Sequence, residues 1–257
     1  MSENTNMINK ESWDKYQDDY MKFHLLKFPD YYNSFLNGEV WLDDYLVDML
    51  GDVKGLKLFD TCCACDAKQA FSWHNLGAKV TACDITPSAI RIAKENARKM
   101  NLEVDFVVDD MQTLSSIKDN EFDVVFATYP VWISDINAAC VTWHRILKKG
   151  GRLLLHAEHP ITYCIDEVEG NLSIIKNYNR PSVEKFESFT GTPLASGFGG
   201  WSVDLPSVEN FWRISDILNA VCDAGFQIVS MHESSDHTAE DSVMGKLPDS
   251  FAMLAVK

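Results

Sequence analysis

The sequence has 257 residues, of which 46% are hydrophobic, enough for one large α/β domain with a sizeable core. Its formal net charge of −15 argues against nucleic acid and anionic membranes as partners, because both are bound through Lys and Arg. We therefore expect a small-molecule ligand. We recognise no signal peptide and no apolar run of membrane-spanning length, and the seven cysteines fit reduced thiols, so we expect a cytoplasmic protein.

The first 50 residues are expected to form a helical cap. Residues 1–10 look disordered, because they are polar and carry no apolar periodicity. After them, large side chains recur at helical spacing: Trp13, Tyr16, Tyr20 and Met21. Packing against the rest of the protein accounts for this stripe, and a lid over a ligand is the alternative.

A strand, a loop, a helix and a second strand follow the cap between residues 57 and 84. The first strand ends at Asp60, the helix runs to Leu76, and the second strand ends at Asp84. This unit binds nucleotides at the carboxyl edge of a parallel sheet. Its loop normally contains glycines, which let the backbone approach the ligand closely, but residues 61–66 contain none.

Strands and helices continue to alternate as far as His156, which predicts a doubly wound, mostly parallel α/β sheet. Residues 160–209 interrupt this pattern, and so long a segment inside a compact domain is typical of a lid or a substrate-binding element. The last two strands, near 226–232 and 247–256, bring the expected number to seven, the final one antiparallel. We predict a cap over 1–50, a Rossmann-like domain over 51–257 and an insertion after the fifth strand.

Six motifs, in order and at the right spacing, give the chain a resemblance to the class I S-adenosylmethionine (SAM) dependent methyltransferases, in the small-molecule branch. They are Phe59-Asp60, the segment 80–86 ending in Asp84-Ile85-Thr86, the segment 106–111 ending in Asp109-Asp110-Met111, Phe122–Val125, Leu147–Gly151, and Ala224–Phe226 with Leu247-Pro248 and Phe251. The resemblance implies SAM as cofactor and methyl transfer to a small-molecule acceptor. The chain departs from the family in the loop, where Cys62, Ala64 and Asp66 replace the glycines.

The resemblance also implies the roles of individual residues. Asp84 would bind the ribose, Asp110 and Met111 the adenine, and the backbone of residues 60–66 the methionine part of SAM. The full implied set of cofactor-binding residues is Tyr20, Asp60, Cys62, Cys63, Ala64, Asp84, Ile85, Asp110, Met111 and Thr128.

Two residues at the ends of strands are candidate catalytic groups, and no metal site is expected. His159 follows the fifth strand, as a general base or as a hydrogen-bonded core residue. Tyr129 follows the fourth strand and either lines the substrate pocket or packs.

Other interpretations stay open. The loop without glycines allows a fold that has lost methyl transfer and catalyses a cyclisation, an elimination or an isomerisation, or only binds a ligand. Cys62 and Cys65 form a CxxC pair at a strand-to-helix junction, which suits redox chemistry, but small buried thiols in place of glycines explain them equally simply. A nicotinamide dehydrogenase is disfavoured, because Asp60 precedes the loop and the glycine fingerprint is absent.

Overall fold

The central sheet has seven strands. The computed structural model describes residues 2–168, 171–179, 182–191, 201, 203–235 and 244–257, without the side chains of residues 2–5 and 167. The strand order is β10-β11-β5-β4-β1-β2-β3. The strands are β1 (Lys57–Asp60), β2 (Lys79–Asp84), β3 (Asp105–Val108), β4 (Phe122–Thr128), β5 (Leu147–Glu158), β10 (Gln227–Ser234) and β11 (Ser250–Val256). Only β11 runs antiparallel to its neighbours in this sheet, which confirms the predicted doubly wound fold with an antiparallel last strand.

Helices cover both faces of the sheet because the side chains of each buried strand alternate between the faces. Leu58 packs with α2–α5 on one face, and its neighbour Phe59 packs with α6 and α7 on the other. Trp73 of α4 and Trp143 of α6 are each fully buried on their own side. The helices are α2 (Tyr31–Leu36), α3 (Asp44–Leu50), α4 (Lys68–Asn75), α5 (Pro87–Met100), α6 (Ile136–Ile146) and α7 (Ile214–Asp223).

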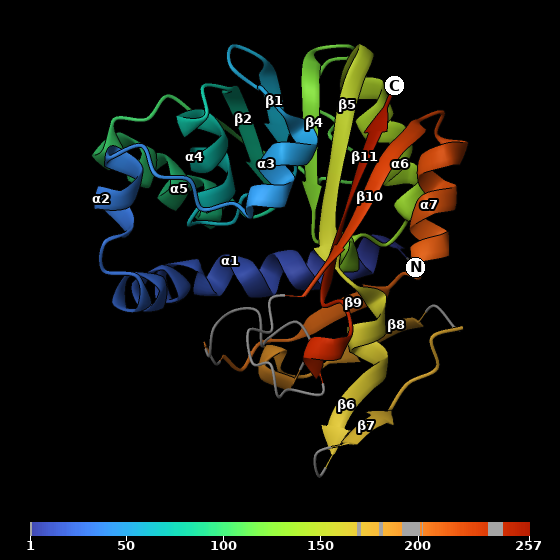
Figure 1. Cartoon of the computed structure of the whole chain (residues 1–257). Coiled ribbons are helices and arrows are strands. Elements are labelled where there is room, and N and C mark those ends of the chain that lie inside the picture. Colours follow the sequence, from blue (N-terminus) through green and yellow to red (C-terminus); the bar gives the residue numbers. More distant parts are fainter. Residues whose placement is uncertain (1, 169–170, 180–181, 192–200, 202, 236–243) are drawn as a thin grey trace.

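The first helix, α1 (Ser2–Lys27), runs across the lower edge of the sheet in Figure 1, where the parallel strands have their carboxyl ends. The prediction that residues 1–10 are disordered is therefore wrong from Ser2 onward. The side chain of Asn9 explains part of this order. Its amide nitrogen donates to the carbonyl of Val208 at 2.8 Å, and its oxygen accepts from the Val208 amide at 2.8 Å.

The insertion after β5 contains two antiparallel hairpins. They are formed by β6 (Ile165–Val168) with β7 (Asn171–Ile174), and by β8 (Ser182–Phe186) with β9 (Ser207–Phe211). Both lie below α1 in Figure 1. Within the predicted 160–209 segment, residues 169–170, 180–181, 192–200 and 202 lie outside the described part. Phe189 and Trp201 contact Trp13, with ring centroids 4.9 and 5.8 Å away, so the insertion packs against α1.

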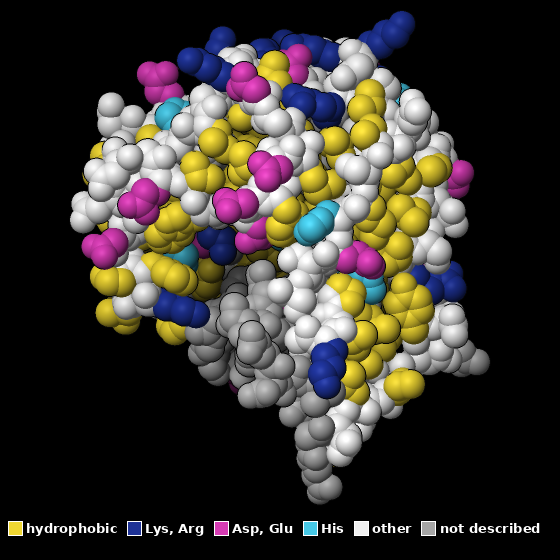
Figure 2. All heavy atoms as spheres, in the orientation of Figure 1, with side chains coloured by type: hydrophobic (Ala, Val, Ile, Leu, Met, Phe, Trp, Pro, Cys, Tyr) yellow, Lys and Arg dark blue, Asp and Glu magenta, His cyan; other side chains and the backbone are white. Residues whose placement is uncertain are grey.

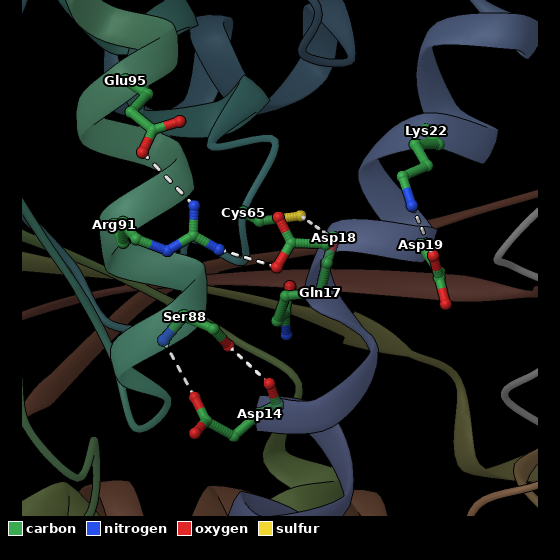
Figure 3. Close-up of polar contacts among 9 residues, drawn as sticks. All are labelled: Asp14, Gln17, Asp18, Asp19, Lys22, Cys65, Ser88, Arg91 and Glu95. Carbon is green, nitrogen blue, oxygen red and sulfur yellow. Dashed lines mark hydrogen bonds and ion pairs between the residues drawn. The ribbon is translucent and has the colours of Figure 1, made fainter.

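Polar contacts fasten α1 to α5 (Figure 3). The Asp14 carboxylate accepts from the Ser88 amide at 2.9 Å, in the first turn of α5. The Asp18 carboxylate forms an ion pair with Arg91 at 2.7 Å. Because Asp18 and Arg91 are both largely exposed, that ion pair orients the helix more than it stabilises it.

Charge is unevenly distributed on the face shown in Figure 2. Lys and Arg gather along its upper rim, at the end of the sheet away from α1, and Asp and Glu are scattered below them. Among the described residues, every helix is too short or too polar to serve as a membrane span.

The two hydrogen bonds of Asn9 should control how firmly α1 is held. Asn9→Ala removes both partners of the buried Val208 peptide, at an expected cost of about 1–3 kcal/mol. We expect the backbone amides of α1 to exchange faster with deuterium, measured by peptide mass spectrometry. Lys15→Ala, an exposed change on the same helix, is the control, and equal exchange in the two variants would contradict the role of Asn9.

Candidate functional site

A cavity lies between α1 and the carboxyl ends of β1, β2 and β4. It encloses about 1000 Å³, counting its open mouth. The residues that line it are Asn6, Asn9, Trp13, Gln17, Tyr20, Thr61, Cys62, Cys63, Ala64, Asp66, Lys68, Gln69, Asp84, Ile85, Thr86, Asp110, Met111, Tyr129 and Trp132.

One face of α1 forms the roof of this cavity. Its contributors are three or four residues apart, the spacing of one helical face, and they are Asn6, Asn9, Trp13, Gln17 and Tyr20. Sequence reasoning predicted Tyr20 but missed the polar members. The helical spacing of these residues is visible in the sequence. The prediction of disorder for residues 1–10 excluded Asn6 and Asn9 from the expected helix.

The loop between β1 and α4 forms the floor, and it turns without glycine. Ala64 and Ala67 take φ values of 53° and 44°, in the left-handed region that glycine usually occupies. Two carboxylates hold the loop backbone. Asp60 accepts from the amide of Cys62 at 3.2 Å, and Asp84 accepts from the amide of Ala64 at 3.2 Å.

The acid at the end of β2 is fixed from both sides. Asp84 is buried, and its Oδ1 accepts from the Thr86 amide at 2.9 Å and from the Thr86 hydroxyl at 2.7 Å. Burial raises the pKa of Asp84, and the hydrogen bonds from Thr86 and Ala64 oppose that rise. The carboxylate is therefore positioned before any ligand binds.

The acid that follows β3 reaches the roof. Asp110 Oδ2 accepts from the side-chain amide of Asn6 at 2.8 Å, and its Oδ1 accepts from the Gln112 amide at 2.9 Å. Its neighbour Asp109 accepts hydrogen bonds from the Ser116 hydroxyl at 2.6 Å and from the Ser116 amide at 2.8 Å. Burial would raise the pKa of Asp109, but these hydrogen bonds outweigh it and lower that pKa. Only the second acid of the pair thus lines the cavity.

Asp66 and Lys68 bring opposite charges to the α4 end of the cavity. The Asp66 carboxylate lies 3.4 Å from the Tyr20 hydroxyl and 3.4 Å from Nδ1 of His24. Burial lowers the pKa of His24, so its ring is neutral at pH 7 and the contact with Asp66 is not an ion pair. Lys68 is the only Lys or Arg among the described lining residues.

Several polar atoms around the cavity have no hydrogen-bond partner among the described residues. They are Asn6 Oδ1, Gln17 Oε1 and Thr61 Oγ1, each buried. Buried polar atoms normally find partners, so their gathering at one cavity indicates a ligand rich in hydrogen-bond donors. The sequence prediction missed Asn6 and Gln17, whereas Thr61 lies in the 60–66 loop whose backbone was expected to bind the methionine part of SAM.

The clustered cysteines do not form a redox or metal site. Cys62, Cys63, Cys65 and Cys83 are buried free thiols, and burial raises the pKa of each, which disfavours the reactive thiolate. Within the described part of the chain, no three His, Cys, Asp or Glu residues are placed to hold a metal ion. The thiols act as small apolar groups in the loop.

The structure separates the predicted catalytic residues. Tyr129 lines the cavity, in a left-handed turn after β4, and its ring stacks on Trp132 at 5.0 Å. His159 does not line it. The His159 ring lies 3.1 Å from Glu233 through Nε2 and accepts from the Ile161 amide at 3.2 Å through Nδ1, so both nitrogens are engaged.

The other predicted binding residues divide into those that line the cavity and those that support it. Cys62, Cys63, Ala64, Ile85 and Met111 line it. Asp60 and Thr128 do not. Both are buried behind it, Asp60 holds the loop through Cys62, and Thr128 ends β4.

The central part of the chain is similar to known methyltransferases. Residues 61–155 match the family model described as a methyltransferase domain. A ubiquinone biosynthesis O-methyltransferase from Xanthomonas oryzae is 29% identical over 113 residues, which are 44% of this chain and 46% of that protein. The chain thus spans about half the length of the curated relatives it matches.

Solved structures share the fold over most of the chain. An S-adenosylmethionine-dependent methyltransferase from Mesorhizobium loti aligns with a TM-score of 0.64 and 20% identity, over 83% of this chain and 96% of that one. The cyclase SpnF aligns with a TM-score of 0.56 and 19% identity, over 83% and 81%. At these identities the likeness shows the fold alone.

The left-handed backbone at Ala64 predicts that glycine stabilises this loop. We expect Ala64→Gly to raise the free energy of unfolding by about 0.5–1 kcal/mol, because the strain it relieves (about 1–2 kcal/mol) exceeds the entropy that glycine adds to the unfolded chain. Urea denaturation measures the change. Ala138→Gly in α6, where the backbone is helical, should lower stability instead, and a loss at both positions would refute the strain.

Raised thiol pKa values predict that the loop cysteines resist alkylation. At pH 8 iodoacetamide should label the exposed Cys222 while leaving Cys62, Cys63 and Cys65 unmodified in the native protein. Peptide mass spectrometry over a time course reads the rates. Labelling of the loop as fast as that of Cys222 would restore the redox interpretation.

Proposed function

We propose that the protein transfers the methyl group of SAM to a small-molecule acceptor, because residues 61–155 match the model of a methyltransferase domain. The observation that carries this proposal is the cavity under α1, at the carboxyl edge of the sheet where ligands of α/β proteins bind. When bound, SAM supplies an electrophilic methyl carbon, and its sulfur keeps the electron pair of the bond that breaks. We also propose a cytoplasmic location, because all seven cysteines are free thiols.

The residues around the cavity fit SAM group by group. Asp84 would accept hydrogen bonds from the ribose hydroxyls, and Asp110, with the Met111 backbone, would hold the adenine edge. The unpaired oxygens of Asn6, Gln17 and Thr61 would meet further donors of the cofactor.

The methionine end of SAM would lie along the loop and the start of α4. The backbone amides of residues 61–64 already donate within the protein, so Lys68 would supply the positive charge that meets the carboxylate of SAM. The nearby carboxylate of Asp66 suits the amino group of SAM. The two opposite side chains thus match the two opposite charges of an amino acid.

The missing glycines do not favour the alternative in which methyl transfer has been lost. That alternative depends on a loop unable to take the required shape, but Ala64 adopts the left-handed backbone that glycine would otherwise supply. The likeness to the cyclase SpnF extends to the fold and carries no reaction to this chain. We therefore retain methyl transfer as the proposed function.

Asp84 provides the sharpest test of the cofactor site. We expect calorimetry to detect micromolar binding of SAM and of S-adenosylhomocysteine to the native protein. Asp84→Ala and Asp84→Asn should each weaken the binding of both ligands by at least about 100-fold, because each substitution removes a charged, buried hydrogen-bond acceptor. Asp105→Ala, an exposed acid at the other end of the neighbouring strand, is the matched control.

Two outcomes would overturn parts of this assignment. Unchanged SAM affinity in a folded Asp84→Asn variant, verified by circular dichroism, would remove Asp84 from the site. If SAM binds but no S-adenosylhomocysteine forms with any of a panel of acceptors, the alternative reactions are favoured over methyl transfer.

A further inference from the structure

Asp66 stands in the place of a loop glycine, but its backbone does not need one. Ala64 and Ala67 have left-handed φ values, whereas Asp66 does not. Its side chain does not cap α4 either, because among the described residues its polar contacts are with Tyr20 and His24. The role of this carboxylate therefore has to come from what surrounds it.

The Asp66 carboxylate is buried without a charged partner. Its side chain is 5% exposed, and no Lys or Arg in the described part of the chain forms an ion pair with it. The His24 ring beside it is neutral at pH 7, because burial lowers the pKa of His24. Burying a carboxylate among neutral groups is costly, so a cationic ligand is the partner that this acid lacks.

The two oxygens of the Asp66 carboxylate have different surroundings. Oδ2 accepts a hydrogen bond from the Tyr20 hydroxyl at 3.4 Å and lies 3.4 Å from Nδ1 of His24. Tyr20 and His24 are four residues apart on α1, so they share one face of that helix. Oδ1 has no partner among the described residues, and Asp66 lines the cavity under α1. The helix thus holds one oxygen and leaves the other for a ligand.

The backbone at Asp66 is fixed independently of its side chain. The Tyr31 hydroxyl of α2 donates to the Asp66 carbonyl. The side-chain amide of Asn96 in α5 donates to the carbonyl of Cys65 at 3.1 Å. Substitution of the carboxylate therefore leaves these two anchors of the loop in place.

Lys68 brings a positive charge to the same end of the cavity without neutralising Asp66. Both side chains line the cavity, and in the described part of the chain no ion pair joins them. Two opposite charges that are held apart fit a ligand with both charges of its own, such as the α-amino acid end of SAM. The ammonium group of that end would lie at Asp66 and its carboxylate at Lys68.

We propose that Asp66 makes the site selective for ligands that carry a free ammonium group, and that Tyr20 is the positioning residue that holds its carboxylate. The inference rests on the proposed binding of SAM. Because Tyr20 belongs to α1, recognition of the ammonium group is complete only when the roof lies on the loop. The replacement of this glycine by Asp66 thus adds selectivity to the loop.

A matched pair of ligands tests recognition of the ammonium group in the full chain and without turnover. S-adenosylhomocysteine and its deamino analogue, in which hydrogen replaces the α-amino group, differ only at the group that Asp66 would bind. We expect calorimetry to show that the native protein binds S-adenosylhomocysteine at least about tenfold more tightly, because a buried charge-assisted hydrogen bond is worth that much. Equal affinities for the two ligands would overturn the inference.

Substitution of Asp66 should remove the preference between the two ligands. Asp66→Gly restores the residue usual in the family, and Asp66→Asn keeps the shape of the side chain. Each should weaken S-adenosylhomocysteine by at least about tenfold without weakening the deamino analogue, which offers Asp66 no positive charge. Asp84→Asn is the matched contrast, because an acid that binds the ribose contributes to both ligands alike and its loss leaves the preference intact.

The Asp66→Gly variant also separates this inference from the simpler view that glycine is the better loop residue. On that view the variant binds S-adenosylhomocysteine more tightly than the native protein. Tighter binding, or an equal loss of affinity for both ligands, would contradict the role of Asp66.

Tyr20→Phe tests the positioning residue. The substitution removes the hydroxyl that donates to Asp66 and keeps the ring, which packs edge-on against Trp201 at 5.2 Å. We expect the preference for S-adenosylhomocysteine to fall at least about threefold, with the affinity for the deamino analogue unchanged. A purely structural role of Tyr20 predicts weaker binding of both ligands and an unchanged preference, and that result would rule out positioning.

The same titrations distinguish failure of this inference from failure of the proposed function. If a folded native sample binds neither SAM nor S-adenosylhomocysteine, the proposed function is wrong. If it binds S-adenosylhomocysteine and its deamino analogue equally well, the selectivity of Asp66 is wrong and the proposed function stands.

Discussion

The turn from β1 into α4 is the constraint on which the site depends. The chain must reverse direction within a few residues at the carboxyl edge of the sheet, and it does so through left-handed alanines where glycine is usual. The backbone strain is offset locally, because Asp60 and Asp84 accept the amides of Cys62 and Ala64. The same two carboxylates tie the ends of β1 and β2 to the loop, so Asp84, the acid proposed to bind the ribose, also shapes the floor of the cavity.

Much of the fold could be predicted because its signals are local. The alternation of buried strands and the apolar faces of α5 and α6 lie within short windows of sequence, and they gave the right order of elements. The first ten residues and the insertion could not be predicted in this way. Asn9 is ordered by Val208, 199 residues away, and the two hairpins of the insertion pack on α1 through contacts as distant in sequence.

The residues of the candidate site also divide into those that the sequence could predict and those that it could not. Asp84 and Asp110 could be predicted, because parallel strands bring their carboxyl ends to one edge of the sheet. His159, the residue after β5, was predicted as a catalytic candidate, but it does not line the cavity. The direction of a side chain where a strand ends cannot be predicted from the sequence, and there His159 meets Glu233 of β10 while its neighbour Glu158 meets Tyr163.

The contacts that hold the roof of the cavity can form only late in protein synthesis. Val208 leaves the ribosome 199 residues after Asn9, a delay of roughly 10–40 s at ~5–20 residues per second. Through that interval α1 has its apolar side chains, Trp13 and Met21 among them, but not the insertion that covers it. Until the insertion is made, α1 therefore lacks the hydrogen bonds and ring contacts that hold it in the folded protein.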